Sequence, residues 1–328
     1  MRFRNARVED IDACLTLLRQ DGGFQAEEEI WAALPELWAE LLKHETAASF
    51  QVFEQSDGQH QEIVAFRCSV FVTEAFADQY AFAPHPQVAA EVWRRHLDKR
   101  SPILDRAAIA RENARGNLQL AVMHWVTRHR DPRHEQTLRV LAMVPAAWQV
   151  AHGGYRLERL VFYEMFYEAA AAVMTNIGYR IYQIPPDLTH PIPGRNASQA
   201  FVFYWPRDEA SLGQGALWPS SAASKLTPKF KLTLAQQRLI LAALEGLRDR
   251  EIAADMGIRY DTVRHSWNAI YKRVEQGDPT LLINEPATDG RRGDEKRRVL
   301  IEYMRQHQEE LRPYDWAIHR ELNPDQAA

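Results

Sequence analysis

The chain has 328 residues, of which 46% are hydrophobic and 26% are charged, and its net charge at pH 7 is −4. This length predicts two domains, and the composition is that of an ordinary globular protein. Two cysteines, Cys14 and Cys68, exclude a disulfide framework and a zinc site built from cysteines. Because no apolar run approaches the length of a membrane span and no apolar signal segment opens the chain, we expect a cytoplasmic protein with no membrane partner.

The first 205 residues alternate between strand-like and helix-like patterns, which predicts one mixed α/β domain. An extended start covers residues 1–8. Runs rich in valine, isoleucine and aromatic residues predict further strands at 49–54, 63–73, 118–127, 157–162, 179–184 and 200–205. Helical spacing of apolar residues predicts a first helix capped by Asp10 and further helices over 27–43, 84–115, 134–152 and 164–176.

Two short motifs and this order of elements resemble the GNAT acetyltransferase family. The motifs are Arg-Asn-Ala-Arg-Val-Glu-Asp at residues 4–10 and Asn-Ile-Gly-Tyr at residues 176–179. The resemblance implies that acetyl-CoA binds to backbone N–H groups of a glycine-rich turn after the fourth strand. Here that turn, residues 128–134, has no glycine, and Met174 stands where the family commonly has its general-acid tyrosine. We therefore expect a GNAT-like domain with no catalytic residue and no bound cofactor.

The same turn is a candidate for holding an anion through side chains, although a solvated surface loop has the same composition. Its three arginines are Arg128, Arg130 and Arg133. The aromatic residues of this domain suit a pocket for a small apolar ligand and suit a plain hydrophobic core equally well. We expect His124 and His152 to be structural, and no group of histidines and carboxylates has the spacing of a metal site.

Residues 206–228 are rich in Ser, Gly, Pro and Ala, which is the composition of a linker. The following segment, residues 229–274, carries nine basic and five acidic residues inside a protein of negative net charge. A local excess of positive charge favours a polyanion as partner, but a solvated helical surface carries the same charge.

Residues 229–274 are predicted to form an all-α domain of three helices. Thr233 is a good N-cap for the first helix, Gly246 ends it, and Gly257 ends a short second one. The third helix begins near Asp261. Its inward positions are expected to be Val263, Trp267, Ile270 and Val274. Two short helices that meet at a glycine, followed by a helix with a basic outer face, are typical of a helix-turn-helix.

The motifs of this segment resemble the DNA-binding domain of LuxR/GerE-type regulators. The matching residues are Leu232-Thr233, Gly246, Glu251-Ile252-Ala253, Gly257-Ile258, Thr262-Val263, Ile270 and Lys272-Arg273. The sequence departs from the family at Gln236, where an acidic residue is usual, and at Ser266, where a histidine is usual, with His265 one place earlier. The resemblance implies a helix-turn-helix fold, whereas the departures imply a different base sequence.

A recognition helix places the side chains of its first turns at base edges in the major groove, while flanking cations hold phosphates. The predicted base contacts are Thr262, Val263, Arg264, His265 and Asn268. The predicted phosphate contacts are Lys231, Arg248, Arg250, Lys272 and Arg273. Arg264 and Asn268 have the forked shapes that pair with guanine and adenine.

Residues 275–328 are predicted to form a loop and one charged helix from Asp294 to about Leu311. The apolar stripe of this helix either supplies a dimer contact or packs back on its own chain. We expect a homodimer, because two half-sites multiply the affinity of a small DNA-binding module.

The sequence thus predicts a transcriptional regulator that binds double-stranded DNA through residues 229–274 and senses a small molecule or a partner through residues 1–205. The alternative is an active GNAT-type N-acetyltransferase, tethered to DNA, with acetyl-CoA as its cofactor. A third possibility is a helix-turn-helix that contacts only protein. A sigma factor is disfavoured, because it requires a helical upstream domain.

Overall fold

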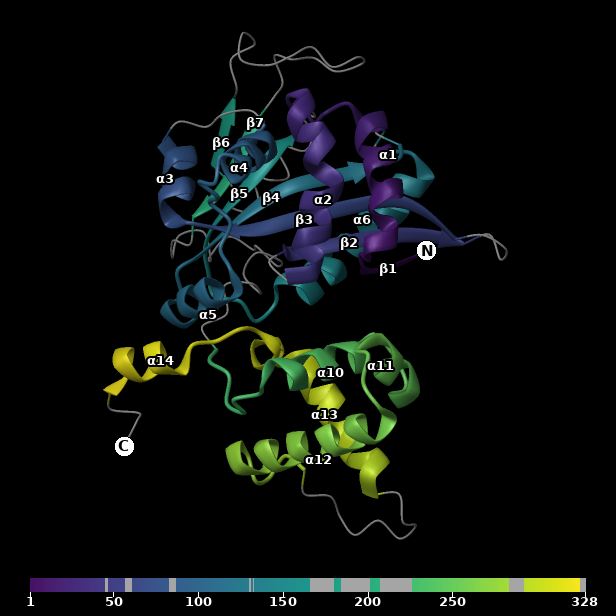
Figure 1. The fold of residues 1–328 in the computed structure, drawn as a ribbon, viewed down its shortest axis with the longest axis vertical. Coiled ribbons are helices and arrows are strands. Elements are labelled where there is room, and N and C mark those ends of the chain that lie inside the picture. The colour runs from purple at the N-terminus through teal and green to yellow at the C-terminus, as the bar shows by residue number, and fades with distance from the viewer. Residues whose placement is uncertain are drawn as a thin grey trace. The chain divides into compact units, whose positions relative to one another are not determined.

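The computed structural model divides into two compact units, which we call the sheet unit and the helical unit (Figure 1). The sheet unit comprises Met1–His152, Arg156–Ser224 and Asp315–Ala328, and the helical unit comprises Gly153–Tyr155 and Lys225–Tyr314. The structure describes residues 1–44, 47–56, 61–82, 87–129, 131, 133–165, 180–183, 201–206, 226–282 and 292–324.

The sheet unit is built on a sheet of seven strands in the order β1-β2-β3-β4-β5-β7-β6. The strands are β1 (Arg2–Asn5), β2 (Ala47–Ser56), β3 (Gln61–Val72), β4 (Leu118–Thr127), β5 (Leu157–Met165), β6 (Arg180–Gln183) and β7 (Phe201–Pro206). β4 and β5 are parallel, whereas the other neighbouring strands are antiparallel. The mixed α/β class is confirmed. Because β5 continues to Met165, the prediction that a helix begins at Glu164 is wrong.

Helices cover both faces of this sheet. The helical segments of the sheet unit are η1 (Val8–Asp10), α1 (Ile11–Asp21), α2 (Glu28–His44), α3 (Glu74–Phe82), α4 (Val88–Leu97), α5 (Arg106–Arg115), α6 (Glu135–His152) and α14 (Trp316–Leu322). Side chains alternate along β3: Phe66 and Cys68 join the core that α1, α2 and α4 cover, whereas Ala65 and Arg67 face α6. The crossover that a parallel pair requires is α6, between β4 and β5.

Within the predicted helical stretch of residues 84–115, the described part from Gln87 onward forms two helices, α4 and α5. Between α4 and α5 the chain turns, and the Asp105 carboxylate accepts a hydrogen bond from the Ala108 N–H at 2.7 Å. This N-cap begins a new helix at Arg106.

Asp10 does not cap α1 as predicted, because it is already held by the turn before that helix. Its Oδ2 accepts a hydrogen bond from the Arg7 backbone N–H at 2.7 Å. The Arg4 guanidinium donates to both Asp10 oxygens, at 2.6 and 2.9 Å, and pairs with Glu54 on β2 at 2.6 Å. Asp10 therefore fastens the first helical turn to β1 and β2.

The helical unit is all-α in the residues that the structure describes. Its helices are α10 (Leu234–Leu244), α11 (Asp249–Asp255), α12 (Tyr260–Gly277), α13 (Arg292–Gln306) and η4 (Gln308–Leu311). A capping box begins α10: the Gln236 N–H donates to Thr233 Oγ1 at 3.4 Å, and the Thr233 N–H donates to Gln236 Oε1 at 2.9 Å. Gly246 and Gly257 have left-handed φ angles of +91° and +63° and follow α10 and α11, as predicted.

The core of the helical unit confirms the predicted inward positions Val263, Trp267, Ile270 and Val274. Leu239 and Ile240 of α10 and Ile252 of α11 belong to the same core. Leu300 and Met304 of α13 belong to the same core and are 0% exposed. These residues of the apolar stripe of α13 therefore pack on their own unit, which is the second of the two alternatives that the sequence left open. The helix is also shorter than predicted, because it ends at Gln306 and is followed by η4.

Gly153–Tyr155 belongs to the helical unit, although it follows α6 in the sequence. Arg312 Nε donates to the Gly153 carbonyl at 2.7 Å, and the Arg312 guanidinium lies 4.7 Å from the centre of the Tyr155 ring. The Asp315 N–H donates to the Ala110 carbonyl of α5, so α14 belongs to the sheet unit.

Some predictions fall outside the described residues. They concern residues 207–225 of the linker, the Asn-Ile-Gly-Tyr motif at 176–179, and Met174. Among the described helices, none combines the length and the apolar character that a membrane crossing requires.

Candidate functional site

The outer side of α12 carries a polar stripe. Four predicted base-contact residues are exposed there, namely Thr262, Arg264, His265 and Asn268. Arg264, Asn268 and the exposed Lys272 are spaced by four residues, which puts them on one side of the helix. His265 Nδ1 lies 2.6 Å from the Asp261 carbonyl, and since a carbonyl only accepts, this nitrogen carries the proton. The stripe therefore offers forked donors and an imidazole.

Val263 lies on the opposite side of α12. It is 0% exposed and packs in the core of the helical unit with Ile270 and Trp267. A side chain enclosed by its own unit cannot reach a groove, so the prediction that Val263 contacts a base is wrong. Its neighbours on the outer side are unaffected.

The predicted phosphate-contact residues lie before α10, at the start of α11 and in the C-terminal half of α12. Lys231, Arg248, Arg250 and Lys272 are exposed, whereas Arg273 is half-buried. Arg273 Nη1 donates to the Lys231 carbonyl at 2.6 Å, which ties the segment before α10 to the C-terminal half of α12. One N–H group of the Arg273 guanidinium is therefore already used in a hydrogen bond within the helical unit.

Cations in the helical unit fall into two classes. Those of α13 pair with carboxylates: Lys296 with Glu275 at 2.8 Å, Arg297 with Asp249 at 2.5 Å, Arg298 with Glu295 at 2.5 Å and Arg305 with Glu302 at 3.1 Å. Within the described part of the chain, no carboxylate pairs with Arg248, Arg250, Arg264 or Lys272. These four cations are therefore available for a ligand, although the first turn of α11 also carries Asp249 and Glu251.

Asp249 and Arg297 join three helices, although neither was among the predicted site residues. Asp249 Oδ1 accepts from Arg297 Nη1 at 2.5 Å and from the indole N–H of Trp267 at 3.2 Å. The Arg297 guanidinium lies 4.6 Å from the centre of the Trp267 ring. No local sequence pattern predicts this contact, because Asp249 and Arg297 are separated by 48 positions.

The arginine-rich turn after β4 uses its cations internally. Arg128 pairs with Glu62 and donates to the Ile63 carbonyl at 3.1 Å. Arg133 pairs with Asp131 at 3.1 Å, and Arg130 lies outside the described residues. The Arg133 N–H donates to the Asp131 carboxylate, so this backbone donor is engaged as well. In its described part, the turn lacks the free cations that the predicted anion site requires.

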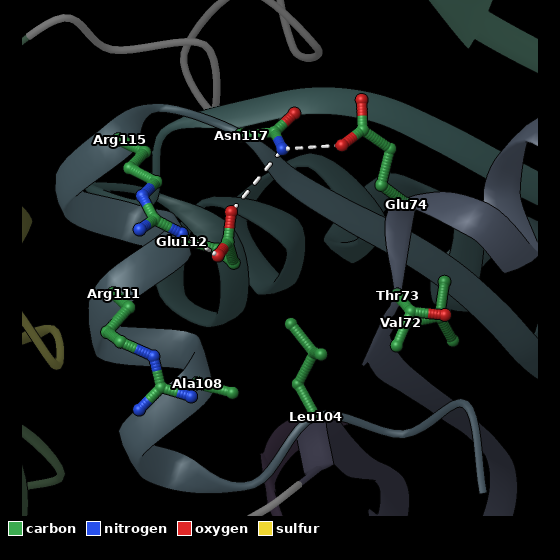
Figure 2. Close-up of a pocket in the computed structure, with 9 residues that line it drawn as sticks. All are labelled: Val72, Thr73, Glu74, Leu104, Ala108, Arg111, Glu112, Arg115 and Asn117. Atoms are coloured by element: carbon green, nitrogen blue, oxygen red, sulfur yellow. Dashed lines mark hydrogen bonds and ion pairs between the residues drawn. The ribbon is translucent and has the colours of Figure 1, made fainter. Parts of the chain in front are cut away.

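A pocket of about 360 Å³ lies beside α5 in the sheet unit (Figure 2). Its lining residues are Val72, Thr73, Glu74, Leu104, Ala108, Arg111, Glu112, Arg115 and Asn117. The Asn117 amide donates to Glu74 at 3.2 Å and to Glu112 at 3.3 Å, and Arg115 pairs with Glu112 at 2.8 Å. Two carboxylates and two guanidiniums share the lining, so the lining carries no excess of either charge.

A polar network lies buried between β3 and α6. Arg67 is 4% exposed, and it donates to Gln51 Oε1 at 2.8 Å and to the Ala147 carbonyl at 2.5 Å. Burial lowers the pKa of Arg67 to about 9. Next to it, Ser69 Oγ lies 3.0 Å from His152 Nε2 and 2.8 Å from Ser49 Oγ. A serine–histidine pair of this geometry suits nucleophilic chemistry, but both residues are buried and have no access to a substrate.

His124 is buried on the other face of the sheet. Its ring meets Phe24 and Trp38 edge-on, at centroid distances of 5.0 and 5.6 Å. Burial lowers the pKa of His124 to about 3, so the imidazole is neutral at physiological pH. Among the described residues, no group of three or more histidine, cysteine, aspartate or glutamate side chains is arranged to hold a metal ion.

Three solved structures align with this chain, whereas comparisons of its sequence found no significant match. No protein-family model matches the sequence, and no curated protein matches it significantly. Naa20 of Chaetomium thermophilum, solved with a bisubstrate analogue, aligns with a TM-score of 0.32 and 16% identity over 66% of this chain and 91% of that chain. The GNAT-like decarboxylase GphF, in complex with isobutyryl-CoA, aligns with a TM-score of 0.35 and 14% identity over 63% and 99%.

FeeM, an N-acyl amino acid synthase from uncultured soil microbes, aligns with a TM-score of 0.31 and 11% identity over 67% of this chain and 95% of that chain. Of these three proteins, the decarboxylase GphF is the one described as GNAT-like. Likeness at this level assigns neither an activity nor a ligand.

Proposed function

We propose that the protein binds double-stranded DNA through the outer side of α12. The observation that carries the proposal is the exposed stripe of Arg264, His265 and Asn268, beside cations that no described carboxylate neutralises. An α-helix fits the major groove, where forked side chains distinguish base pairs. We assign base contacts to Thr262, Arg264, His265 and Asn268.

The proposed phosphate contacts lie at the start of α11 and in the C-terminal half of α12, with Lys231 before α10. Arg248 and Arg250 flank the first residue of α11, and Lys272 lies two turns beyond Arg264 on α12. Cations at such positions hold the phosphates on either side of a groove and set the register of the helix within it. Arg273, which donates a hydrogen bond to the Lys231 carbonyl, and Lys231 itself are further proposed phosphate contacts.

We assign to the sheet unit a sensory or scaffold role in a transcriptional regulator. The paired arginines of the turn after β4 and the buried Ser69–His152 pair support a role without catalysis. Binding as a homodimer, with one half-site for each copy, is part of the proposal. The dimer contact must come from a surface other than the buried stripe of α13.

The test begins with selection of 30-base-pair duplexes from a random pool by the full-length protein. The selected duplex is then titrated in fluorescence anisotropy at several salt concentrations. We expect affinity to fall steeply with salt, and Arg264→Ala to weaken binding by about 1–3 kcal/mol. Arg305→Ala, whose charge Glu302 already neutralises, is the matched control. Failure to select any duplex, or equal binding by Arg264→Ala, would contradict the proposal.

Acyl transfer in the sheet unit is the second candidate, and one observation favours it. The described ladder between β4 and β5 ends at Ala121 and Val161, although β4 continues to Thr127. An extended ligand can add to strand edges released in this way through main-chain hydrogen bonds. Calorimetry with acetyl-CoA tests this candidate: a micromolar Kd would support it, and no heat of binding up to millimolar acetyl-CoA would reject it.

A further inference from the structure

Three helices of the helical unit meet at one side chain. Asp249, the first residue of α11, accepts hydrogen bonds from the Trp267 indole of α12 and the Arg297 guanidinium of α13, at 3.2 and 2.5 Å. Arg297 also lies over the Trp267 ring, at 4.6 Å from its centre. We propose that this trio, which we call the clamp, positions α12 for reading DNA and makes α13 a working part of the DNA-binding module. The inference rests on the proposed function.

The short helix α11 needs such an anchor. It has seven residues, Asp249–Asp255, and buries Ile252 and Ala253. A helix of this length is not stable alone, so its orientation depends on tertiary contacts. Arg248, its N-cap residue, and Arg250, in its first turn, are the two cations of this helix that we assign to phosphates. A carboxylate fixed between these two residues fixes the position of both cations.

The clamp acts on α12 from its inner side. Trp267 is 4% exposed and precedes Asn268, and it lies three residues after Arg264. The indole ring is therefore attached to the same turn of helix as the two forked side chains on the outer side. A rotation or tilt of α12 that moves Trp267 must move Arg264 and Asn268 as well.

A second ion pair links α13 to the far end of α12. Lys296 Nζ lies 2.8 Å from Glu275 Oε1, near the last residues of α12. Successive residues of α13 thus hold the start of α11 and the end of α12. A planar guanidinium can stack on an indole and bond a carboxylate at the same time, which an ammonium group cannot do equally well.

The clamp is a positioning device more than a source of stability. The side chains of Asp249 and Arg297 are 21% and 28% exposed, and ion pairs in such surroundings contribute little to the free energy of unfolding. The core of Leu239, Val263 and Ile270 does not include them. Loss of the clamp should therefore alter DNA reading while the unit remains folded.

The experiment compares Arg297→Met with Arg298→Met in the full-length protein. Arg298 is the next residue, is exposed, and pairs with Glu295 of its own helix, so it is a matched control. The probes are the duplex selected from the random pool and a shuffled duplex of equal length. We expect Arg297→Met to weaken binding to the selected duplex about tenfold, a change of about 1.4 kcal/mol. Binding to the shuffled duplex should weaken less than binding to the selected duplex, because only the selected duplex is read through base contacts. Arg298→Met should behave as wild type.

Three further measurements separate positioning from a general structural defect. Arg297→Lys should restore part of the selectivity, because it restores the charge. Asp249→Asn should act like Arg297→Met, and the double variant should bind no more weakly than either single variant, because the residues act as one unit. Hydrogen exchange followed by mass spectrometry should show faster exchange in residues 249–255 of Arg297→Met and an unchanged sheet unit.

The outcomes are distinguishable. Wild-type selectivity and unchanged exchange in Arg297→Met would overturn the clamp while leaving DNA binding intact. Equal loss on the selected and shuffled duplexes would overturn the positioning role. If the wild-type protein selects no duplex, the proposed function fails and the clamp loses its role in DNA reading with it.

Discussion

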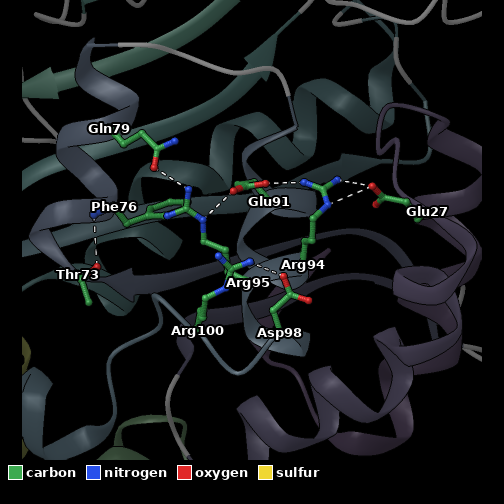
Figure 3. A network of polar contacts seen from close by, with 9 residues as sticks. All are labelled: Glu27, Thr73, Phe76, Gln79, Glu91, Arg94, Arg95, Asp98 and Arg100. Atoms are coloured by element: carbon green, nitrogen blue, oxygen red, sulfur yellow. Dashed lines mark hydrogen bonds and ion pairs between the residues drawn. The ribbon is translucent and has the colours of Figure 1, made fainter.

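The arginines of α4 in the sheet unit and the cations on the outer side of α12 in the helical unit differ in their pairing. In the sheet unit, Arg94 bridges Glu27 and Glu91 at 2.5 Å, and Arg95 joins Glu91 at 2.7 Å to Gln79 at 2.6 Å (Figure 3). In the helical unit, Arg264 and Lys272 stand on the outer side of α12 and pair with no described carboxylate. Paired guanidiniums hold α4 to its neighbours, whereas cations without counter-charges keep a field that attracts a polyanion.

This difference supports the proposed function better than the total charge does. The net charge of −4 describes the whole chain and conceals the local excess on residues 229–274. Counting cations is not sufficient either, because the turn after β4 is rich in arginine and its described members are paired. The attraction for a polyanion depends on whether a carboxylate already pairs with each cation.

The largest expected effect separates the stability of the two units. Gly154 has a φ of +80°, and a Cβ atom there would lie 2.3 Å from the Glu309 backbone nitrogen, within the helical unit. Gly154→Ala should destabilise the helical unit by about 3–5 kcal/mol, since it combines a left-handed conformation with a backbone clash. The measurement is urea unfolding of the full chain, followed by hydrogen exchange in each unit.

Gly246→Ala is the control for this prediction. Gly246 has a φ of +91°, but a Cβ atom there meets nothing within 4 Å. It should cost only the backbone strain, about 1–2 kcal/mol. Equal losses at the two glycines would show that the clash at Gly154 is relieved by local movement.

The second effect belongs to the sheet unit and depends on pH. Burial lowers the pKa of His124 from 6.5 to about 3, so the unfolded state binds more protons than the folded state between these values. Stability is therefore complete above pH 6.5 and falls as pH decreases through this window, by about 1.4 kcal/mol per pH unit. His124→Phe should remove this slope, so that unfolding midpoints in urea at pH 7 and pH 5 differ less than in wild type. His44→Phe, at the exposed end of α2, should keep the wild-type slope.

The third prediction tests the free cations directly. Lys272→Ala should weaken binding of the selected duplex about tenfold at low salt and reduce the slope of log K against log salt by about 0.9, because one phosphate contact is lost. Arg298→Ala should leave both quantities unchanged, since Glu295 already neutralises that charge. A wild-type salt slope in Lys272→Ala would remove this residue from the phosphate set.

The smallest effect concerns the start of α10. Thr233→Ala removes the capping box with Gln236 and should destabilise the helical unit by about 1 kcal/mol. Thr262→Ala, at an exposed position of α12, should change stability by less than about 0.5 kcal/mol. Thermal unfolding of the two variants provides the comparison. A stability loss at Thr262 as large as that at Thr233 would contradict it.

The sequence by itself determined those features that depend on neighbours along the chain. The capping residue Thr233, the helix-ending Gly246 and Gly257, and the inward stripe of Val263, Trp267, Ile270 and Val274 are local signals, and the structure confirms each of them. Gln236, which departs from the LuxR/GerE pattern, completes the capping box because an amide can accept the same hydrogen bond as a carboxylate. The alternation along the predicted strands likewise gave the mixed α/β class.

Tertiary structure decided the features that depend on residues far apart in the chain. The sequence marks Asp10 as a helix cap, but in the folded chain its carboxylate bonds to Arg4 and Arg7. The stripe of α13 is compatible with a dimer contact or with packing on its own chain, and the folded unit shows the second. Whether a cation is free or paired is also a tertiary property, because Arg297 finds Asp249 only in the folded chain. Local rules cannot give such contacts, since each requires the orientation of two separate elements.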